Sequence, residues 1–216
     1  MNILALIPSY NHGKYLPFVV EDVKKYCKDI LIVDDGSTDN TSDILQKLKD
    51  VNYITHQENK GKGAALKTGF KYAIDNKYGA VITIDADGQH KAFDIPNFIK
   101  KIPEHSMIIG SRMHNVRNMP LRRILANSIS SFGVSLKTGQ KIYDSQSGFR
   151  MIRTDLLKDI KLDNDGYHLE TEIIIKSIKQ GYNIGHINIE TIYGKETSHI
   201  NPLKATFRFL KTLLQY

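Results

Sequence analysis

"VITIDADGQH", residues 81–90, joins a β-prone run directly to two carboxylates, an amide and a histidine. The run before Asp85 is short, continuous and apolar, which is typical of a strand that a parallel sheet buries on both faces. In open parallel sheets, ligands bind beyond the carboxyl ends of the strands. Asp85 and Asp87 are therefore expected to lie at a binding edge.

The sequence before and after this stretch alternates between strand and helix patterns. Strands are expected over residues 3–7, 30–34, 52–57, 80–85 and 107–111, and helices over 15–27, 41–49, 64–76 and 92–102. The second half is less regular, with helices expected over 120–138, 168–181 and 202–216 and a strand within 182–190. Such alternation predicts right-handed βαβ units, and hence an α/β, Rossmann-like fold with a mostly parallel central sheet flanked by helices.

Composition limits the class of protein. The 216 residues are 41% hydrophobic, which suits one globular domain, and the single cysteine, Cys27, favours a reducing cytoplasm. No window approaches the ~20 apolar residues that a membrane span needs. The net charge of +7 either serves solubility alone or indicates a polyanionic partner: phosphate, nucleic acid or an anionic membrane surface. The nucleic-acid alternative needs a known binding module or exposed aromatic residues among the basic ones, and we find neither in the sequence.

Polar clusters follow three of the expected strands. They are "PSYNHG" (8–13), "DDGSTDNT" (34–41) and "DADGQH" (85–90). The "GKG" at 61–63 lacks the full phosphate-loop pattern, so we interpret it as close packing at a helix start. Three clusters at strand ends predict one ligand site at the sheet edge.

The "DADGQH" cluster has the chemistry of a metal site. Carboxylates two residues apart at an unwinding strand end repel each other unless a cation lies between them. Asp85, Asp87 and Gln89 offer the hard oxygen ligands that Mg²⁺ and Mn²⁺ prefer, and Mg²⁺ needs only one or two protein carboxylates beside water and phosphate. An EF-hand is excluded, because His90 and Pro96 occupy the places of its glycine and glutamate.

Taken together, several segments resemble the inverting family 2 glycosyltransferases of GT-A fold. Within that family they are most similar to the dolichol-phosphate mannosyltransferase and bacterial polyprenyl-phosphate glycosyltransferase branch. The segments are "IPSYNHGKYL", "IVDDGSTDNTSDIL", "NKGKGAALKTGF", "ITIDADGQH", "GSR" and "DSQSGFRMI", in matching order over residues 1–200.

The resemblance implies roles for individual residues. It assigns the nucleotide-sugar to Pro8, Tyr10, His12, Val33, Asp35, Asp85, Ala86, Asp87, Gln89 and Arg112, with His12 replacing the acid usual in the family. It assigns Mg²⁺ or Mn²⁺ to Asp85, Asp87 and Gln89, and the acceptor to Arg123, Asn127, Ser147 and Arg150. Asp87, Arg112 and Arg123 are expected to be catalytic. The segment "DSQSGFR" (144–150) is either this acceptor-side loop or a turn followed by a strand with Phe149 in the core.

The expected reaction moves a hexose from a GDP- or UDP-sugar to a polyprenyl or dolichyl phosphate. A lipid phosphate is already anionic near neutral pH and needs no strong base, but it does need cationic side chains. Four arginines meet that need: Arg112, Arg117, Arg122 and Arg123. A saccharide hydroxyl acceptor is the alternative and requires a base, for which Glu170 and Glu172 are candidates, although either could be structural. A nucleotidyltransferase is disfavoured, because "PSYNHGKYL" lacks a glycine-rich basic loop.

The C-terminal residues 201–216 form a separate expected element. Leu203, Phe207, Leu210 and Leu214 recur at helical spacing beside a basic stripe. Such a helix suits an anionic membrane surface, or it closes the core, and both can hold. We therefore expect a GT-A domain over 1–200, a C-terminal amphipathic helix, and a cytoplasmic protein peripheral to the inner membrane face. The sugar, the nucleotide and the oligomeric state are left open.

Overall fold

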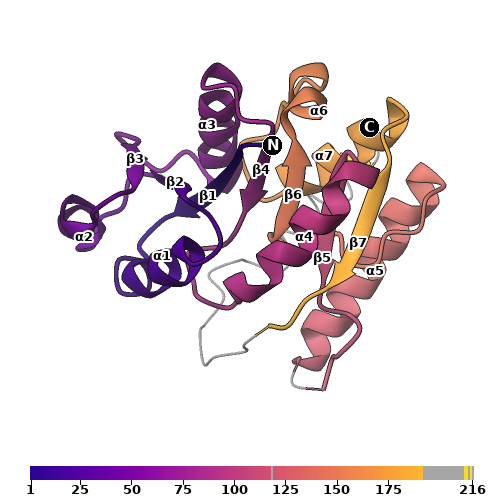
Figure 1. Ribbon diagram of the computed structural model, residues 1–216. Coiled ribbons are helices and arrows are strands. Elements are labelled where there is room, and N and C mark those ends of the chain that lie inside the picture. Colours follow the sequence, from indigo (N-terminus) through magenta and orange to yellow (C-terminus); the bar gives the residue numbers. More distant parts are fainter. Residues whose placement is uncertain (118, 192–211, 214, 216) are drawn as a thin grey trace.

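The computed structural model describes residues 1–117, 119–191, 212–213 and 215, and within them seven strands form a single sheet (Figure 1). The strands are β1 (Ile3–Ser9), β2 (Asp29–Asp34), β3 (Asn52–Thr55), β4 (Ala80–Thr83), β5 (Met107–Ser111), β6 (Arg150–Arg153) and β7 (Ile184–Asn188). Their order is β3-β2-β1-β4-β6-β5-β7. β6 runs antiparallel to β4 and β5, and the other pairs are parallel, which confirms the predicted mostly parallel α/β sheet.

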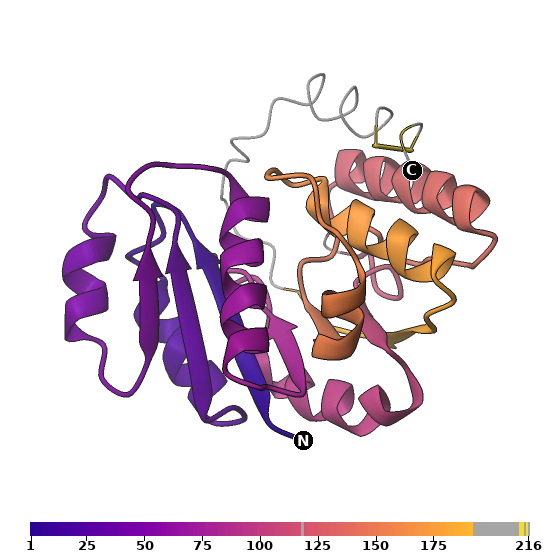
Figure 2. The ribbon, with the colours of Figure 1, turned by 90° about the horizontal axis from the view of Figure 1, so that it is seen from above.

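Helices cover both faces of the sheet, because successive side chains of each strand point to opposite sides. The helices are α1 (Leu16–Lys24), α2 (Thr41–Lys47), α3 (Lys62–Asp75), α4 (Ile95–Lys101), α5 (Leu121–Thr138), α6 (Thr154–Asp159) and α7 (Leu169–Lys179), with short 3₁₀ turns η1 (Ala92–Asp94) and η2 (Ile102–Glu104). Leu4 and Leu6 face the core beneath α3, α6 and α7, whereas Ala5 and Ile7 face the core beneath α1 and α4. Figure 2 shows α5 beside α7, farther from the strands.

The predicted elements are present with small differences at their ends. The strand expected over 80–85 ends at Thr83, because its last ladder pair joins Thr83 to Arg150, and Asp85 lies beyond the strand, just before a turn. The helix expected over 92–102 is α4 between two 3₁₀ turns. Strand β6 and helix α6 were not firmly predicted, since both are too short for a clear period.

Other expectations fall partly outside the described residues. The C-terminal helix expected over 202–216 lies largely beyond them, and the domain boundary at residue 200 stays a prediction. Among the described helices, none has the length and apolar character needed to cross a bilayer.

The strand order places the polar clusters together. After β3 the chain crosses to the other side of β1, so that β1 lies between β2 and β4. This is a topological switch point, where the loops beyond the strand ends diverge and leave room for a ligand. The loops after β1, β2 and β4 carry the three clusters predicted from the sequence.

Candidate active site

Asp85 is the charged residue at the centre of this edge. Its Oδ1 accepts a hydrogen bond from Lys62 Nζ at 2.6 Å, and its Oδ2 lies 3.8 Å from His90 Nε2. Burial raises the pKa of Asp85, but the Lys62 ammonium outweighs that effect and holds the pKa at about 2. Burial lowers the pKa of His90 to about 4, so its ring is neutral near pH 7. Asp85 is therefore an ionised carboxylate whose side chain is 25% exposed.

Gly148 forms the wall behind this carboxylate. A Cβ atom at position 148 would lie 2.5 Å from Asp85 Oδ2, closer than real contacts allow. Thr83, one residue before the turn, donates its hydroxyl to the Gly148 carbonyl at 2.7 Å and so fixes the two segments together. Position 148 therefore has no room for a side chain where it meets Asp85.

Lys62 is a site residue that sequence reasoning did not identify. It begins α3, and its ammonium joins Asp85 to Glu170 Oε1, which is 3.1 Å away. Burial alone would lower the pKa of Lys62, but the two carboxylates raise it by more. The pKa of Lys62 therefore lies above its usual value, and the lysine stays charged. Its flanking glycines behave as predicted: Cβ atoms at Gly61 and Gly63 would each lie 2.6 Å from backbone atoms of residues 165–166. The prediction that "GKG" packs closely at a helix start is confirmed. The lysine between the two glycines reaches Asp85 in the site.

The two candidate glutamates have different positions. Glu172 is buried and accepts the backbone N–H groups of Asp163 and Asn164 at 2.8 and 2.9 Å, while Lys176 donates to it at 2.6 Å. It is a structural anchor for the loop before α7. Glu170 instead lies beside Lys62, next to Asp85.

The turn after Asp85 orders the remaining proposed metal ligands. Asp87 Oδ1 accepts the backbone N–H of Gln89 at 2.9 Å, and Gly88 takes a φ of 72°, a left-handed value that glycine adopts readily. Asp87 and Gln89 are half-buried, whereas Ala86 is buried. The described residues contain no preformed cluster of three or more His, Cys, Asp or Glu for a metal. An ionised Asp85, Asp87 and the Gln89 amide still fit Mg²⁺ or Mn²⁺, which complete their coordination with water and phosphate.

A second cluster gathers around the buried Asp144. Arg112 donates to both Asp144 oxygens, with Nε at 2.8 Å and Nη2 at 2.9 Å, and Asn127 donates at 2.7 Å. Burial raises the pKa of Asp144, but these donors lower it overall. The structure thus brings Arg112, a predicted donor residue, together with Asn127, a predicted acceptor residue, through an acid that the sequence did not single out. Arg123 is half-buried in the first turn of α5.

Two expected acceptor residues, Arg150 and Ser147, are buried. Arg150 is 1% exposed, and its guanidinium donates to the carbonyls of Ser147, Glu170 and Ser145. Ser147 is fully buried in the same turn. Arg150 therefore holds the segments around β6 and α7 together, and Phe149 lies in the core next to the strand. The acceptor role of residues 144–150 stays a prediction.

The residues predicted to bind the nucleotide include both buried and partly exposed side chains. Tyr10 is 40% exposed and His12 is half-buried, so both side chains border the edge. Pro8 is buried in β1, and the Val33 side chain lies in the hydrophobic core, so the contact of these two residues with a donor stays a prediction. The loops after β1 and β2 are joined, since Asn11 Oδ1 accepts the backbone N–H of Thr38 at 2.8 Å.

Asp35 is 2% exposed and is held by the chain itself. Its oxygens accept the backbone N–H groups of Lys60 and Gly61 at 3.1 and 2.7 Å, and His56 Nδ1 lies 2.7 Å away. Asp35 therefore positions the start of α3, from which Lys62 extends. Its contact with a donor ribose stays a prediction.

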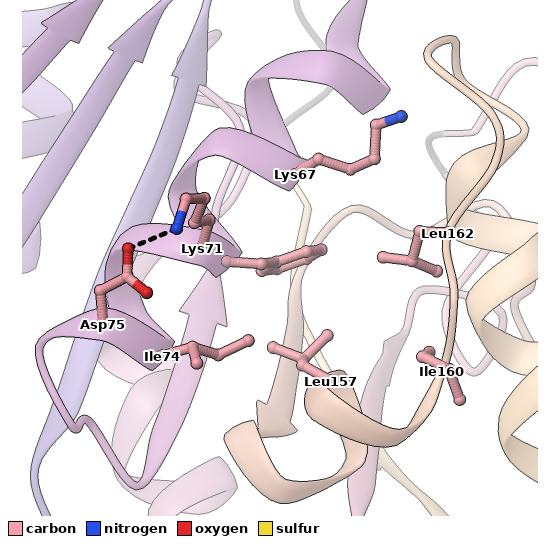
Figure 3. A pocket seen from close by; sticks show the side chains of 8 residues that line it. Lys67, Lys71, Ile74, Asp75, Leu157, Ile160 and Leu162 are labelled. Atoms are coloured by element: carbon pink, nitrogen blue, oxygen red, sulfur yellow. Dashed lines mark hydrogen bonds and ion pairs between the residues drawn. The ribbon is translucent and has the colours of Figure 1, made fainter.

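A groove elsewhere has little of this chemistry. It lies between α3 and the segment around α6, and Figure 3 shows aliphatic side chains such as Ile74 and Leu157 facing it beside the Lys71–Asp75 ion pair. It is open to solvent and carries no predicted site residue. The sheet edge is therefore the stronger candidate.

Comparisons with known proteins agree with this geometry. The family model "Glycosyl transferase family 2" matches residues 5–161. The UDP-N-acetylglucosamine–dolichyl-phosphate N-acetylglucosaminyltransferase of Methanococcus voltae is 36% identical over 215 residues, covering 88% of this chain and 86% of that protein. The polyprenol monophosphomannose synthase of Mycolicibacterium smegmatis is 30% identical over 200 residues, covering 86% and 76%.

A solved structure shares the fold. Glucosyl-3-phosphoglycerate synthase from Mycobacterium tuberculosis, in complex with Mn²⁺, UDP-glucose and phosphoglyceric acid, matches 99% of this chain and 79% of its own. The TM-score is 0.74 at 18% identity, so this likeness supports the GT-A fold alone.

Proposed function

The chain belongs to glycosyl transferase family 2, in its polyprenyl-phosphate branch, and we propose that it transfers a hexose from a GDP- or UDP-sugar to a polyprenyl or dolichyl phosphate. The observation that supports this acceptor most is the pair of relatives, each at least 30% identical, whose names specify dolichyl phosphate or polyprenol monophosphomannose. The transfer is proposed to invert the anomeric carbon.

The proposed donor site is the edge around Asp85. Asp85, Asp87 and Gln89 would hold Mg²⁺ or Mn²⁺, which when bound neutralises charge on the departing nucleoside diphosphate. The chain prepares this site by keeping Asp85 ionised against Lys62 and by ordering Asp87 on the Gln89 backbone. Arg112 is oriented by its two contacts with Asp144, which sets its planar guanidinium before a phosphate arrives.

The proposed acceptor site lies toward the first two turns of α5. Arg123 is in the first turn and Asn127 follows one turn later, on the Asp144 cluster that also holds Arg112. A phosphate oxygen is itself the nucleophile and has no proton to lose, so this chemistry requires cations and no general base. The enzyme is proposed to work at the cytoplasmic face of a membrane, where such a lipid is exposed.

The decisive test is a donor panel with Mn²⁺ and a short-chain polyprenyl phosphate, followed by release of nucleoside diphosphate and by mass of the lipid product. We expect one nucleotide-sugar to give glycosyl-phospho-lipid, and EDTA to abolish turnover until Mn²⁺ is restored. Transfer to a saccharide hydroxyl with none to the lipid phosphate would favour the alternative acceptor. Full turnover after removal of divalent metal would contradict the donor site.

A further inference from the structure

His90 is a buried histidine that faces the carboxylate at the centre of the sheet edge. Its side chain is 4% exposed, and its Nε2 atom lies 3.8 Å from Asp85 Oδ2. The other oxygen of that carboxylate, Oδ1, is held by Lys62 Nζ at 2.6 Å. A separation of 3.8 Å is roughly 1 Å longer than an ordinary N–H···O hydrogen bond. A small rotation of the Asp85 carboxylate would therefore bring Oδ2 within hydrogen-bonding distance of His90.

The surroundings of His90 and Asp85 restrict which of the two groups can move. Phe149 packs against the His90 ring with centroids 5.4 Å apart, and Phe98 packs against Phe149 at 4.6 Å. Gly148 closes the space behind the carboxylate, where an added Cβ atom would lie 2.5 Å from Asp85 Oδ2. Because close-packed rings in a core have little room to shift, the ring of His90 is the fixed partner and the carboxylate is the one that turns.

The second ring nitrogen of His90 has a partner within reach. His90 Nδ1 and Thr191 Oγ1 are both buried, and neither has a hydrogen-bond partner among the described residues. The two residues lie opposite each other in an antiparallel bridge, which places their Cβ atoms about 4.5–5.5 Å apart. A buried polar atom without a partner is unfavourable, so both atoms gain if the hydroxyl donates to the ring nitrogen.

The segment that carries Thr191 is fastened beside His90. Lys91 Nζ pairs with Glu190 at 2.7 Å, and Asp94 Oδ2 accepts the backbone N–H of Glu190 at 3.3 Å. These contacts join the residue before Thr191 to the residues that follow His90. The bridge between the two residues is therefore supported on both sides in sequence.

We propose that His90 is a positioning residue for the metal site: its Nε2–H donates to Asp85 Oδ2, while its Nδ1 accepts the hydroxyl of Thr191. This chain of hydrogen bonds fixes the tautomer of the ring and leaves Asp85 Oδ1 to face a cation in place of Lys62. Carboxylates that bind metals are themselves held by hydrogen bonds from neighbouring groups in this way. The inference rests on the proposed function and adds how the fold aims one of its acidic ligands.

The test is an electron paramagnetic resonance titration of Mn²⁺ with the full chain, in two variants that remove opposite properties of His90. His90→Phe keeps the aromatic packing on Phe149 and removes both nitrogens, whereas His90→Gln keeps an N–H near the place of Nε2 and removes the ring. We expect the Mn²⁺ affinity of His90→Phe to fall at least about tenfold, and that of His90→Gln to stay within about threefold of the wild type.

The matched control is His105→Phe. His105 precedes β5, at the opposite edge of the sheet, and its Nδ1 is likewise buried without a partner among the described residues. The same exchange there should leave Mn²⁺ affinity unchanged. Circular dichroism melts establish that each variant folds.

Thr191 supplies a second measurement. Thr191→Val removes the hydroxyl and keeps the branched shape of the side chain. We expect Mn²⁺ affinity to fall about threefold in the wild-type background and to stay unchanged in His90→Phe, where no ring nitrogen is left to accept the hydroxyl. An equal loss in both backgrounds would show that Thr191 does not act through His90.

Two results with the fold intact would overturn the role of His90. One is wild-type affinity in His90→Phe, because aromatic packing alone would then suffice. The other is an equal loss in His90→Phe and His90→Gln, because the loss would not follow the N–H group.

The titration contains neither sugar donor nor lipid, so its result is separable from the proposed function. If the variants behave as expected but the wild type glycosylates no polyprenyl phosphate, the function fails and the role of His90 stands. If the wild type glycosylates the lipid while His90→Phe binds Mn²⁺ normally, the function stands and this inference fails.

Discussion

At the scale of single residues, Lys62 competes with any metal for Asp85. Its ammonium lies 2.6 Å from Asp85 Oδ1 and 3.1 Å from Glu170 Oε1, so it neutralises the carboxylates when no divalent cation is present. We predict that Lys62→Met binds Mn²⁺ about tenfold more tightly without donor, because removing the positive charge leaves the site more negative. Electron paramagnetic resonance titration of free Mn²⁺ measures this directly.

The control for Lys62→Met is Lys71→Met on the same helix, whose side chain is 76% exposed. It removes the same charge away from Asp85 and should leave Mn²⁺ binding unchanged. Circular dichroism melts confirm that both variants fold. Weaker Mn²⁺ binding by Lys62→Met, with the fold intact, would show that the lysine supports the metal site instead of competing for it.

Gly148 gives a second prediction, about space. Because a Cβ atom there would lie 2.5 Å from Asp85 Oδ2, Gly148→Ala should displace the carboxylate and lower kcat at least about a hundredfold. Gly166→Ala is the matched control, since no atom lies within 4 Å of its added Cβ. Steady-state kinetics with saturating Mn²⁺ measure the effect. If Gly148→Ala kept full turnover, the position of Asp85 would not matter for the reaction.

The sequence identified some site residues and missed others for a physical reason. Asp85 and Asp87 follow directly from a buried strand, so a local pattern reveals them. Lys62 and Asp144 come from other elements, and nothing near them in sequence indicates a shared partner. Glu170 was a candidate base, but its pairing with Lys62 depends on the fold. Burial likewise depends on the whole fold, which is why Arg150 looked like a phosphate ligand before its three carbonyl contacts were visible.

At the scale of elements, α5 carries two residues of the proposed acceptor site, Arg123 and Asn127. Arg123 in its first turn is proposed to bind the acceptor phosphate. Arg123→Ala should therefore raise KM for polyprenyl phosphate at least about tenfold while slow donor hydrolysis by water changes less than about twofold. Lys47→Ala, a charge change on the exposed side of α2, is the control. Equal losses in both reactions would place Arg123 on the donor side.

Elements with a clear period were predictable, and short ones were not. The alternating strands and helices of the first half follow from apolar spacing alone, apart from small differences at their ends. Strand β6 has four residues and enters the sheet antiparallel between β4 and β5. A strand so short carries no clear signal, and its direction depends on pairing with distant segments. The apolar positions of α5 were visible in the sequence, but their outward direction is set by the contacts of Asn127 and Ser131.

At the scale of the whole molecule, the strand order places two kinds of chemistry on one chain. The switch between β1 and β4 gathers the acids proposed to hold the donor. The segment from β5 through α5 carries the cations proposed to meet the acceptor phosphate. The mostly parallel sheet and its ligand edge could be predicted from sequence, because both follow from the order of strand and helix patterns. The joining of Arg112 to helix α5 through Asp144 could not.

The most direct test of this account is a crystal soaked with Mn²⁺ and the nucleotide-sugar that supports turnover. We predict a Mn²⁺ ion about 2.0–2.6 Å from oxygens of Asp87 and of the donor diphosphate, with Asp85 turned away from Lys62 toward the ion. Donor bound in the same cleft, with no metal and with Asp85 still paired to Lys62, would contradict the central claim that these acids hold a cation for the leaving group.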